Sequence, residues 1–274
     1  MAAFGVTGRT TMPKIPSNVR GARFTGWGTA LGHETVTNDD LAKTIDTSDE
    51  WVRERTGIHR RHIGGSTAEL SIASGAAALQ MAGIDPTTID ALVLATTTPD
   101  RTVPATSATV QNALGLRCGA FDINAACSGF VYGLVNAHGL IAMGAERILL
   151  IGTDTLRRIT DWTDRNTAIL FADGSGAAVL EATSGHGQLL GWILMPMVQP
   201  KKFCIQTSAR PCIWTERKFS VAPFASWWIV LRSRWLMLVS PQIRSTSLFR
   251  IRPTSESSLP HASVSASPWI EHQS

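Results

Sequence analysis

Several residue types are missing from the end of the chain. Residues 193–274 contain no Gly, Asp, Asn or Tyr, although the 274-residue chain has 23 glycines. A folded segment of that length should hold about six glycines at an average usage of ~7%. Turns and left-handed backbone positions draw on Gly, Asn and Asp. This absence argues against an ordinary natural domain over residues 193–274.

Long apolar runs and cysteines are also scarce. No uninterrupted apolar run approaches the ~18 residues that cross a bilayer, and residues 1–20 lack the apolar stretch of a secretory signal. Four cysteines in a chain of this length do not make a disulfide scaffold. Charged residues make up 17% and hydrophobic residues 44%, which excludes a generally disordered chain. We therefore expect a globular, cytoplasmic protein with no membrane partner.

The basic charge of the chain comes from its last part. Residues 1–192 carry 15 Lys+Arg and 18 Asp+Glu, whereas residues 193–274 carry 10 Lys+Arg and 3 Glu. These basic residues are scattered, without a stripe or a nucleic-acid-binding motif, so we expect no nucleic-acid partner. The seven histidines show no metal-ligand spacing, and we expect no metal site.

Predicted strands and helices alternate over residues 20–192, after a polar extension at 1–19. The apolar runs at 89–98 and 147–153 have the length of strands that are buried on both faces. Broad apolar faces that end at a glycine predict helices over 67–83 and 105–115. Further strands are expected at 22–31, 120–124 and 177–182, and further helices at 38–45, 46–55 and 127–144. This alternation predicts an α/β layered fold with a mostly parallel sheet.

Cys127 stands where a predicted strand gives way to a long apolar helix, in the sequence DINAACSGF (122–130). Small residues on both sides allow a tight turn. The free backbone N–H groups and the dipole at a helix start favour the thiolate form. The pattern is typical of a nucleophile elbow. A buried, unreactive core cysteine is the alternative, since free cysteines are commonly buried.

Four stretches resemble the N-terminal half of β-ketoacyl-acyl carrier protein synthase III, a condensing-enzyme family of the thiolase superfamily. They are DTSDEWVRERTGIHRRHI (46–63), FDINAACSGF (121–130), IGTDTL (151–156) and TDRNTAILFADGSGAAVL (163–180). The resemblance implies a thiolase-like layered α/β fold, of which residues 20–192 supply the first half, and a homodimer.

The resemblance also implies a reaction. In this family an acyl group moves from coenzyme A to a cysteine, and malonyl-acyl carrier protein then loses CO₂ and attacks the thioester. The product is a 3-oxoacyl-acyl carrier protein, which initiates fatty acid synthesis. The implied partners are an acyl-coenzyme A and malonyl-acyl carrier protein, and no cofactor is needed beyond the coenzyme A thioester that serves as substrate.

Residue roles follow from the matching motifs. By resemblance, Cys127 is the acylated nucleophile. Trp51, Arg55 and Arg165 resemble the residues that hold the nucleotide end of coenzyme A, with Thr47 at a neighbouring position. Two further residues resemble part of the pocket around the pantetheine arm and the cysteine: Leu170 and Phe171.

The residues by themselves leave plainer interpretations open. Trp51 and Arg55 are four apart and share a helix face, so they could stack adenine and pair with phosphate, or simply form a surface stack. Arg165 could pair with Asp164 or Asp161. Residues 171–176 (FADGSG) could be only a tight turn between strands.

The family also needs a histidine and an asparagine from its C-terminal half, which hydrogen-bond the malonyl thioester carbonyl and stabilise the enolate. Neither a PHQAN-like nor a GNTSAAS-like motif is present in this chain. With one base restored after the Trp192 codon, however, three stretches back-translate in order into family-like phrases. Residues 193–198 give DLDADG, 213–229 give YMDGKEVFRRAVRVVVD and 247–256 give LFVPHQANIR.

We therefore expect residues 193–274 to be a non-native, out-of-frame tail without a defined domain. The alternative is a genuine basic C-terminal domain. The chain should then accept an acyl group on Cys127 at most and not condense it, or it is a non-catalytic remnant that binds or dimerises with a full-length relative. Residues 31–33 (LGH) and 156–158 (LRR) differ from the family pattern, and the second stretch is close to the expected binding site.

Overall fold

The computed structural model describes residues 18–185 and 187–191, with four short strands farther along the chain. Most of the predicted extension at 1–19 and most of 193–274 lie outside the described residues. The helices are α1 (Asn38–Ala42), α2 (Asp49–Thr56), α3 (Thr67–Ala82), α4 (Thr106–Ala113), α5 (Gly129–Ala142), α6 (Arg165–Ala168) and the 3₁₀ helices η1 (Pro86–Thr88), η2 (Ala126–Ser128) and η3 (Leu156–Arg158). The strands are β1 (Gly21–Leu31), β2 (Glu34–Thr37), β3 (Arg60–Ile63), β4 (Ala91–Ala95), β5 (Gly119–Ile123), β6 (Arg147–Thr155), β7 (Asp173–Thr183), β8 (Leu189–Gly191), β9 (Ile205–Thr207), β10 (Arg210–Ile213), β11 (Trp227–Leu231) and β12 (Met237–Val239).

Five strands form the main sheet, in the order β1-β7-β6-β4-β5. β4 pairs in parallel with β5 and β6, whereas β7 runs antiparallel to both β6 and β1. The predicted α/β layered fold is confirmed, but the sheet is mixed rather than mostly parallel. A parallel return needs a long crossover connection, usually a helix. The connection from β6 to β7 carries only the short helices η3 and α6, and β7 folds back along β6.

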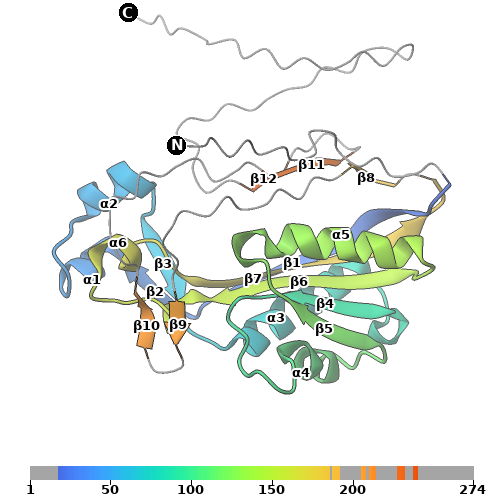
Figure 1. Ribbon diagram of the computed structural model, residues 1–274, viewed down its shortest axis with the longest axis horizontal. Helices are drawn as coiled ribbons and strands as arrows, with labels where there is room; N and C mark the ends of the chain where they lie inside the picture. Colours follow the sequence, from blue (N-terminus) through green and yellow to red (C-terminus); the bar gives the residue numbers. More distant parts are fainter. Residues whose placement is uncertain are drawn as a thin grey trace, which may run out of the picture. The chain divides into compact units, whose positions relative to one another are not determined.

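Helices cover both faces of this sheet (Figure 1). α5 lies on one face, and α3 and α4 lie on the other. Because successive residues of a strand point to opposite faces, Ile148 and Leu150 of β6 belong to the apolar cluster with α5, while Leu149 and Ile151 belong to the cluster with α3 and α4. The continuous apolar run over 147–153 therefore reflects burial on both sides of the strand, as the sequence predicted.

Two glycines of β1 let helix α3 lie directly on the sheet edge. A Cβ atom at Gly28 would stand 2.3 Å from the Ser74 carbonyl oxygen, and one at Gly26 would stand 2.3 Å from the Ala78 carbonyl oxygen. Such distances are too short for any side chain, so the backbones of strand and helix touch only because both positions are glycine. This contact fixes the position of α3 on the sheet.

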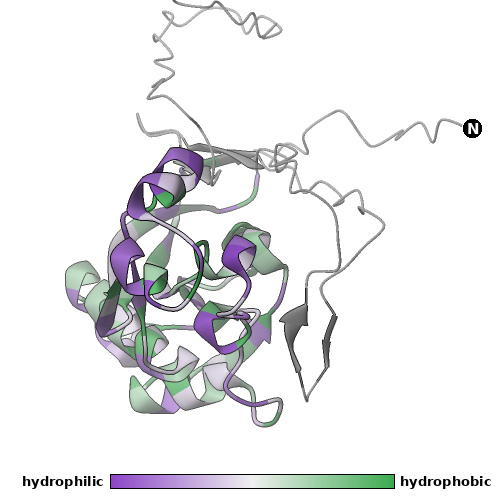
Figure 2. Ribbon diagram, turned by 90° about the vertical axis from the view of Figure 1, so that its left-hand side faces the viewer, coloured by the Kyte–Doolittle hydropathy of each residue, from purple (hydrophilic) through white to green (hydrophobic). Residues whose placement is uncertain are grey.

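A smaller module packs around Leu41, Val52 and Ile169, and consists of α1, α2, α6 and the antiparallel pair of β2 and β3. The small helices that face the viewer in Figure 2 carry long hydrophilic stretches. Arg61 of β3 is buried, and its guanidinium donates to Asn38 Oδ1 (2.8 Å) and to the Ile169 carbonyl (3.2 Å). Burial lowers the pKa of Arg61. The sequence did not reveal β2 and β3, which have four residues each and no apolar run.

The other predicted elements are present, with changed boundaries. The helix expected over 127–144 is divided into η2 and α5, and the run at 89–98 contributes only the strand β4. The strand expected at 177–182 begins earlier, at Asp173. A tight turn at 171–176 is therefore wrong: Gly174 and Gly176 are strand residues that pair with Leu31 and Thr29.

Short strands are also described farther along the chain. β9 pairs with β10, and β11 pairs with both β8 and β12, all antiparallel. Whether residues 193–274 lack a defined domain stays a prediction. Within the described ranges, no helix has both the length and the apolar character that crossing a membrane requires.

Candidate active site

Cys127 lies in the turn that joins β5 to α5. It is the middle residue of η2, and α5 begins two residues later. Ala126 has a φ of 46°, a left-handed conformation that residues other than glycine rarely adopt. Its amide N–H donates to Asn124 Oδ1 (3.1 Å). Cys127 is exposed, so the alternative of a buried core cysteine is wrong.

A hollow of about 400 Å³ lies beside Cys127. Its wall consists of the ends of β4 and β6, the start of β7 and the first turn of α5. Glycines in this wall leave space for the hollow. At Gly152, for example, a Cβ atom would stand only 3.0 Å from Cδ2 of Phe130. The hollow therefore lies at the carboxyl ends of the parallel strands, where α/β sheets commonly bind ligands.

Two aspartates stand in the wall of this hollow. Asp154 Oδ1 accepts the amide N–H (2.8 Å) and the hydroxyl (2.6 Å) of Thr97. The Asp173 carboxylate is fully buried, accepts the Gly64 N–H (2.7 Å) and pairs with Arg157 Nε (2.7 Å). Sequence reasoning assigned neither aspartate a role. The available signal was an acidic residue near the end of one buried strand, β6, and at the start of the next, β7.

A third carboxylate holds the start of α4 against β5. Asp122 accepts the backbone N–H groups of Thr106 (3.0 Å) and Ser107 (2.9 Å). The residue before this helix, Ala105, has no side chain that could cap it. A negative charge at a helix start interacts favourably with the unpaired N–H groups there. Asp122 thus ties α4 to the strand that leads into the Cys127 turn.

Trp51, Arg55 and Arg165 come together at the surface of the small module. The Cζ atom of Arg165 lies 3.8 Å from the centroid of the Trp51 ring, and that of Arg55 lies 4.3 Å from it. Both are within cation–π distance. Arg165 also pairs with Asp46 Oδ2 (3.4 Å), so the predicted alternatives, Asp164 and Asp161, are not its ion-pair partners.

Two buried polar atoms, one on Arg165 and one four residues before Trp51, lack a hydrogen-bond partner among the described residues. They are Oγ1 of Thr47, just before the N-cap Ser48 of α2, and Nε of Arg165, and both are buried. Buried polar groups in proteins are almost always hydrogen-bonded. Both atoms could therefore take part in binding a polar ligand, and the choice between a ligand site and a plain surface stack stays open.

Leu170 and Phe171 lie in the segment that joins α6 to β7 and are half-buried. Leu170 packs against the apolar cluster of the small module. The wall of the Cys127 hollow is formed instead by the residues that follow, Ala172 and Asp173. The structure thus brings the three aromatic and cationic side chains together, and it places Cys127 in a separate hollow.

This arrangement offers two kinds of chemistry. An exposed cysteine beside a hollow can attack an electrophilic carbonyl carbon. Indole and guanidinium groups can hold a planar base and phosphates. Over the described part of the chain, no three His, Cys, Asp or Glu side chains gather in a way that could hold a metal ion.

Comparisons with known proteins point to one family. The family model described as 3-oxoacyl-[acyl-carrier-protein (ACP)] synthase III matches residues 121–195. Among curated proteins, the β-ketoacyl-[acyl-carrier-protein] synthases III of Erythrobacter litoralis and Sinorhizobium medicae are 51% identical over 175 residues and 50% identical over 167 residues. These matches cover 62% and 59% of this chain, but only 54% and 52% of the relatives. The chain spans about half the length of the curated relatives it matches.

Solved structures give the same result. The 3-oxoacyl-[acyl-carrier-protein] synthase III of Aquifex aeolicus is 39% identical with a TM-score of 0.60. The match covers 62% of this chain and 56% of the Aquifex chain. The enzyme of Pseudomonas aeruginosa is 42% identical with a TM-score of 0.59, and the match covers 63% of this chain and 55% of the Pseudomonas chain. The priming β-ketosynthase of the R1128 polyketide pathway is 32% identical with a TM-score of 0.61, and the match covers 65% of this chain and 55% of the ketosynthase chain.

Proposed function

Because the chain belongs to the β-ketoacyl-acyl carrier protein synthase III family, we propose that Cys127 accepts an acyl group from an acyl-coenzyme A. The thiolate sulfur attacks the acyl carbonyl carbon, the new C–S bond forms, and the bond to the coenzyme A sulfur breaks. Coenzyme A leaves and takes up a proton. The observation that carries this proposal is the exposed Cys127 at the start of α5, beside a hollow of about 400 Å³.

The proposal assigns the nucleotide end of coenzyme A to the surface around Trp51. The buried, unpaired Thr47 Oγ1 and Arg165 Nε could take part in binding a polar ligand there. The Arg165 guanidinium stands 3.8 Å from the Trp51 ring centroid, so a planar base that stacks on that face of the ring has to displace it. Arg55 then remains available to a phosphate. Leu170 and Phe171 would line the path of the pantetheine arm between this surface and Cys127.

We propose that this chain does not carry out the second half of the family reaction. Condensation with malonyl-acyl carrier protein needs groups that stabilise the enolate formed on loss of CO₂. The histidine and asparagine motifs that supply them in the family do not occur in this sequence. The chain should therefore form the Cys127 thioester and not condense it. Initiation of fatty acid synthesis in the cytoplasm, with malonyl-acyl carrier protein and a homodimeric enzyme, would be the activity of the full-length family member.

Labelling with radioactive acetyl-coenzyme A tests the acylation step. We expect about one acetyl group per chain, located on Cys127 by peptide mass spectrometry, and loss of labelling to background in Cys127→Ser. Cys118→Ser is the matched control, because Cys118 is half-buried and burial raises the pKa of its thiol.

A thiol-alkylating reagent separates two reasons for failure. If iodoacetamide modifies Cys127 but acetyl-coenzyme A does not, the cysteine is accessible and the acyl-transfer proposal is wrong. A non-catalytic remnant that only binds or dimerises would then be the better account. Acetylation that persists in Cys127→Ser would equally contradict the assignment of the nucleophile.

A further inference from the structure

The connection between β6 and β7, residues 156–172, carries three of the side chains assigned to coenzyme A: Arg165, Leu170 and Phe171. It begins with two consecutive arginines, Arg157 and Arg158, in η3. Neither arginine has a part in the chemistry described above. Each of them, however, forms an ion pair with an aspartate on another segment.

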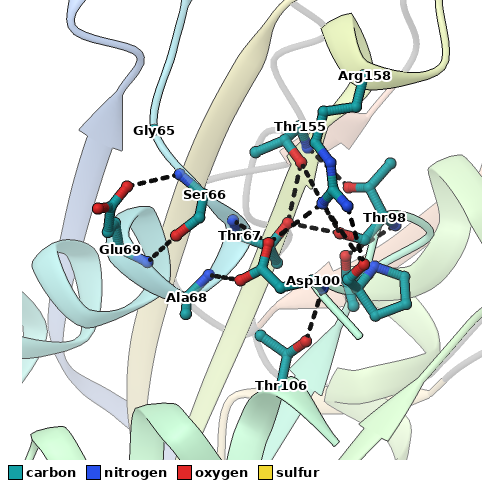
Figure 3. A network of polar contacts seen from close by, with 12 residues as sticks. Gly65, Ser66, Thr67, Ala68, Glu69, Thr98, Asp100, Thr106, Thr155 and Arg158 are labelled. Carbon is teal, nitrogen blue, oxygen red and sulfur yellow. Dashed lines mark hydrogen bonds and ion pairs between the residues drawn. The ribbon is translucent and has the colours of Figure 1, made fainter. Parts of the chain in front are cut away.

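Arg158 joins the connection to the loop after β4 (Figure 3). Its Nη1 donates to Asp100 Oδ1 (3.1 Å) and to the Thr98 carbonyl (3.2 Å). The Asp100 carboxylate also accepts the N–H groups of Thr67 (3.0 Å) and Ala68 (2.7 Å) at the start of α3. Asp100 therefore links η3, the loop after β4 and the first turn of α3.

The same network extends to α4 and to the end of β6. The Asp100 N–H donates to Thr106 Oγ1 (3.0 Å), in the first turn of α4. The Thr155 N–H donates to Thr98 Oγ1 (2.7 Å), and the hydroxyls of Thr67 and Thr155 lie 3.0 Å apart. Apart from the bond between Asp100 and Thr106, these contacts join positions that are at least 32 residues apart, so they fix the base of the connection to the main sheet.

Arg157 closes the connection on itself. Its Nε pairs with Asp173 Oδ2 (2.7 Å) and its backbone N–H donates to Asp173 Oδ1 (3.1 Å), at the other end of the connection. Its carbonyl accepts the indole N–H of Trp162 (3.2 Å), and its Nη2 donates to the Gly65 carbonyl (3.2 Å). Both ends of the 156–172 connection are therefore held at one place.

We propose that Arg157 and Arg158 are positioning residues, which clamp the base of the 156–172 connection and so set where Arg165 stands relative to Trp51. The clamp holds the connection in the form that receives the nucleotide end of coenzyme A. This inference rests on the proposed function for its consequence in binding. The clamp itself can be tested without it.

Arg158→Gln is the variant of choice. Asp100 keeps its two hydrogen bonds from α3 in this variant, and the Arg158 side chain is partly exposed, so the fold should survive. The Asp173 carboxylate, by contrast, is completely buried and would lose its charge partner in an Arg157 variant. Arg101→Gln is the matched control. Arg101 is exposed and lines, together with Arg157 and Arg158, a second hollow beside the start of α3, which is distinct from the one at Cys127. Its replacement removes the same charge.

Hydrogen exchange of the full chain, followed by mass spectrometry, reports on the clamp directly. We expect peptides from 160–171 to exchange about fivefold faster in Arg158→Gln than in the unmodified chain, as fits the loss of one partly exposed ion pair. Peptides from α5 should not change, and Arg101→Gln should match the unmodified chain. Equal exchange of 160–171 in all three proteins would overturn the proposal. So would an increase that includes α5, because that indicates general destabilisation.

Labelling of Cys127 with acetyl-coenzyme A measures how the clamp affects coenzyme A binding. In Arg158→Gln the acetyl-coenzyme A concentration for half-maximal labelling should rise about fivefold, while the rate of alkylation by iodoacetamide stays the same. Arg158→Lys, which keeps the charge, should recover part of the loss. A slower iodoacetamide reaction would show that the hollow itself had changed, against the proposal. If the unmodified chain takes no acetyl group, the proposed function fails, and the exchange result still decides whether the clamp exists.

Discussion

Most buried polar side chains of the described region have a hydrogen-bond partner, and His138 is an exception. It lies on α5, is 6% exposed, and its Nε2 has no partner among the described residues. Burial disfavours the charged imidazolium, which lowers the pKa of His138. The neutral ring is therefore the form that the folded protein stabilises.

The pH dependence of stability follows from that shift. Above pH ~6.5 the imidazole is neutral in both the folded and the unfolded chain, and His138 adds no pH dependence. As the pH falls below the unfolded value, the unfolded chain binds the proton first, so the free energy of unfolding decreases. At pH 5.5 the loss from this one residue is at most about 1.4 kcal/mol.

His138→Leu should remove this part of the pH dependence. Urea denaturation at pH 7.5 and pH 5.5 gives the change in unfolding free energy for both proteins, and the change should be smaller in the variant. The other titrating groups are common to both proteins, so they cancel in the comparison. An equal or larger loss in His138→Leu would show that His138 is protonated as easily when folded as when unfolded.

At the scale of elements, two glycines have opposite significance. Gly28 of β1 touches the backbone of α3, where a Cβ atom would be 2.3 Å from the Ser74 carbonyl oxygen. Gly139 of α5 is exposed, and a Cβ atom there meets nothing within 4 Å. The first glycine is required by packing, whereas the second only weakens a helix.

Alanine substitutions should therefore change stability in opposite directions. Gly28→Ala forces α3 away from β1, and we expect a loss of about 2 kcal/mol or more, the size of overpacking in a close-packed core. Gly139→Ala should gain about 0.5–1 kcal/mol, because glycine is the poorer residue inside a helix. Thermal and urea denaturation of the two variants measure both effects. A tolerated Gly28→Ala would mean that α3 does not rest on β1 as described.

At the scale of elements, the sequence predicts where strands and helices lie, but not how the strands run or which distant residues meet. Apolar runs and glycine stops located the strands and helices of the sheet, since burial on both faces requires such runs. They did not carry strand direction, so the antiparallel β7 was missed. Cys127 could be proposed as the nucleophile because its signal is local. Asp154 and Asp173 could not, since their roles depend on partners that are 57 and 109 residues away, Thr97 and Gly64.

At the scale of the whole molecule, the chain corresponds to about half of its relatives. The curated matches cover 54% and 52% of those proteins. The resemblance implies that the family's histidine and asparagine lie in the half that is not matched. The resemblance of residues 193–274 to the family appears only when they are read with one base restored after the Trp192 codon. A one-base loss, if the gene carries it, would account for the absence of Gly, Asp, Asn and Tyr there without a special fold.

Restoring that base should therefore restore condensation. Sequencing the DNA across the Trp192 codon comes first and tells whether the base is absent from the gene. In the restored frame the chain should carry the LFVPHQANIR phrase in place of residues 247–256. With acetyl-coenzyme A and malonyl-acyl carrier protein, it should release CO₂ and form 3-oxobutyryl-acyl carrier protein, whereas the present chain should stop at the Cys127 thioester. Cys127→Ser in the restored frame is the control and should abolish both steps. Condensation by the present chain would refute the account of an out-of-frame tail, because the histidine and asparagine would then be dispensable or supplied from elsewhere in residues 193–274.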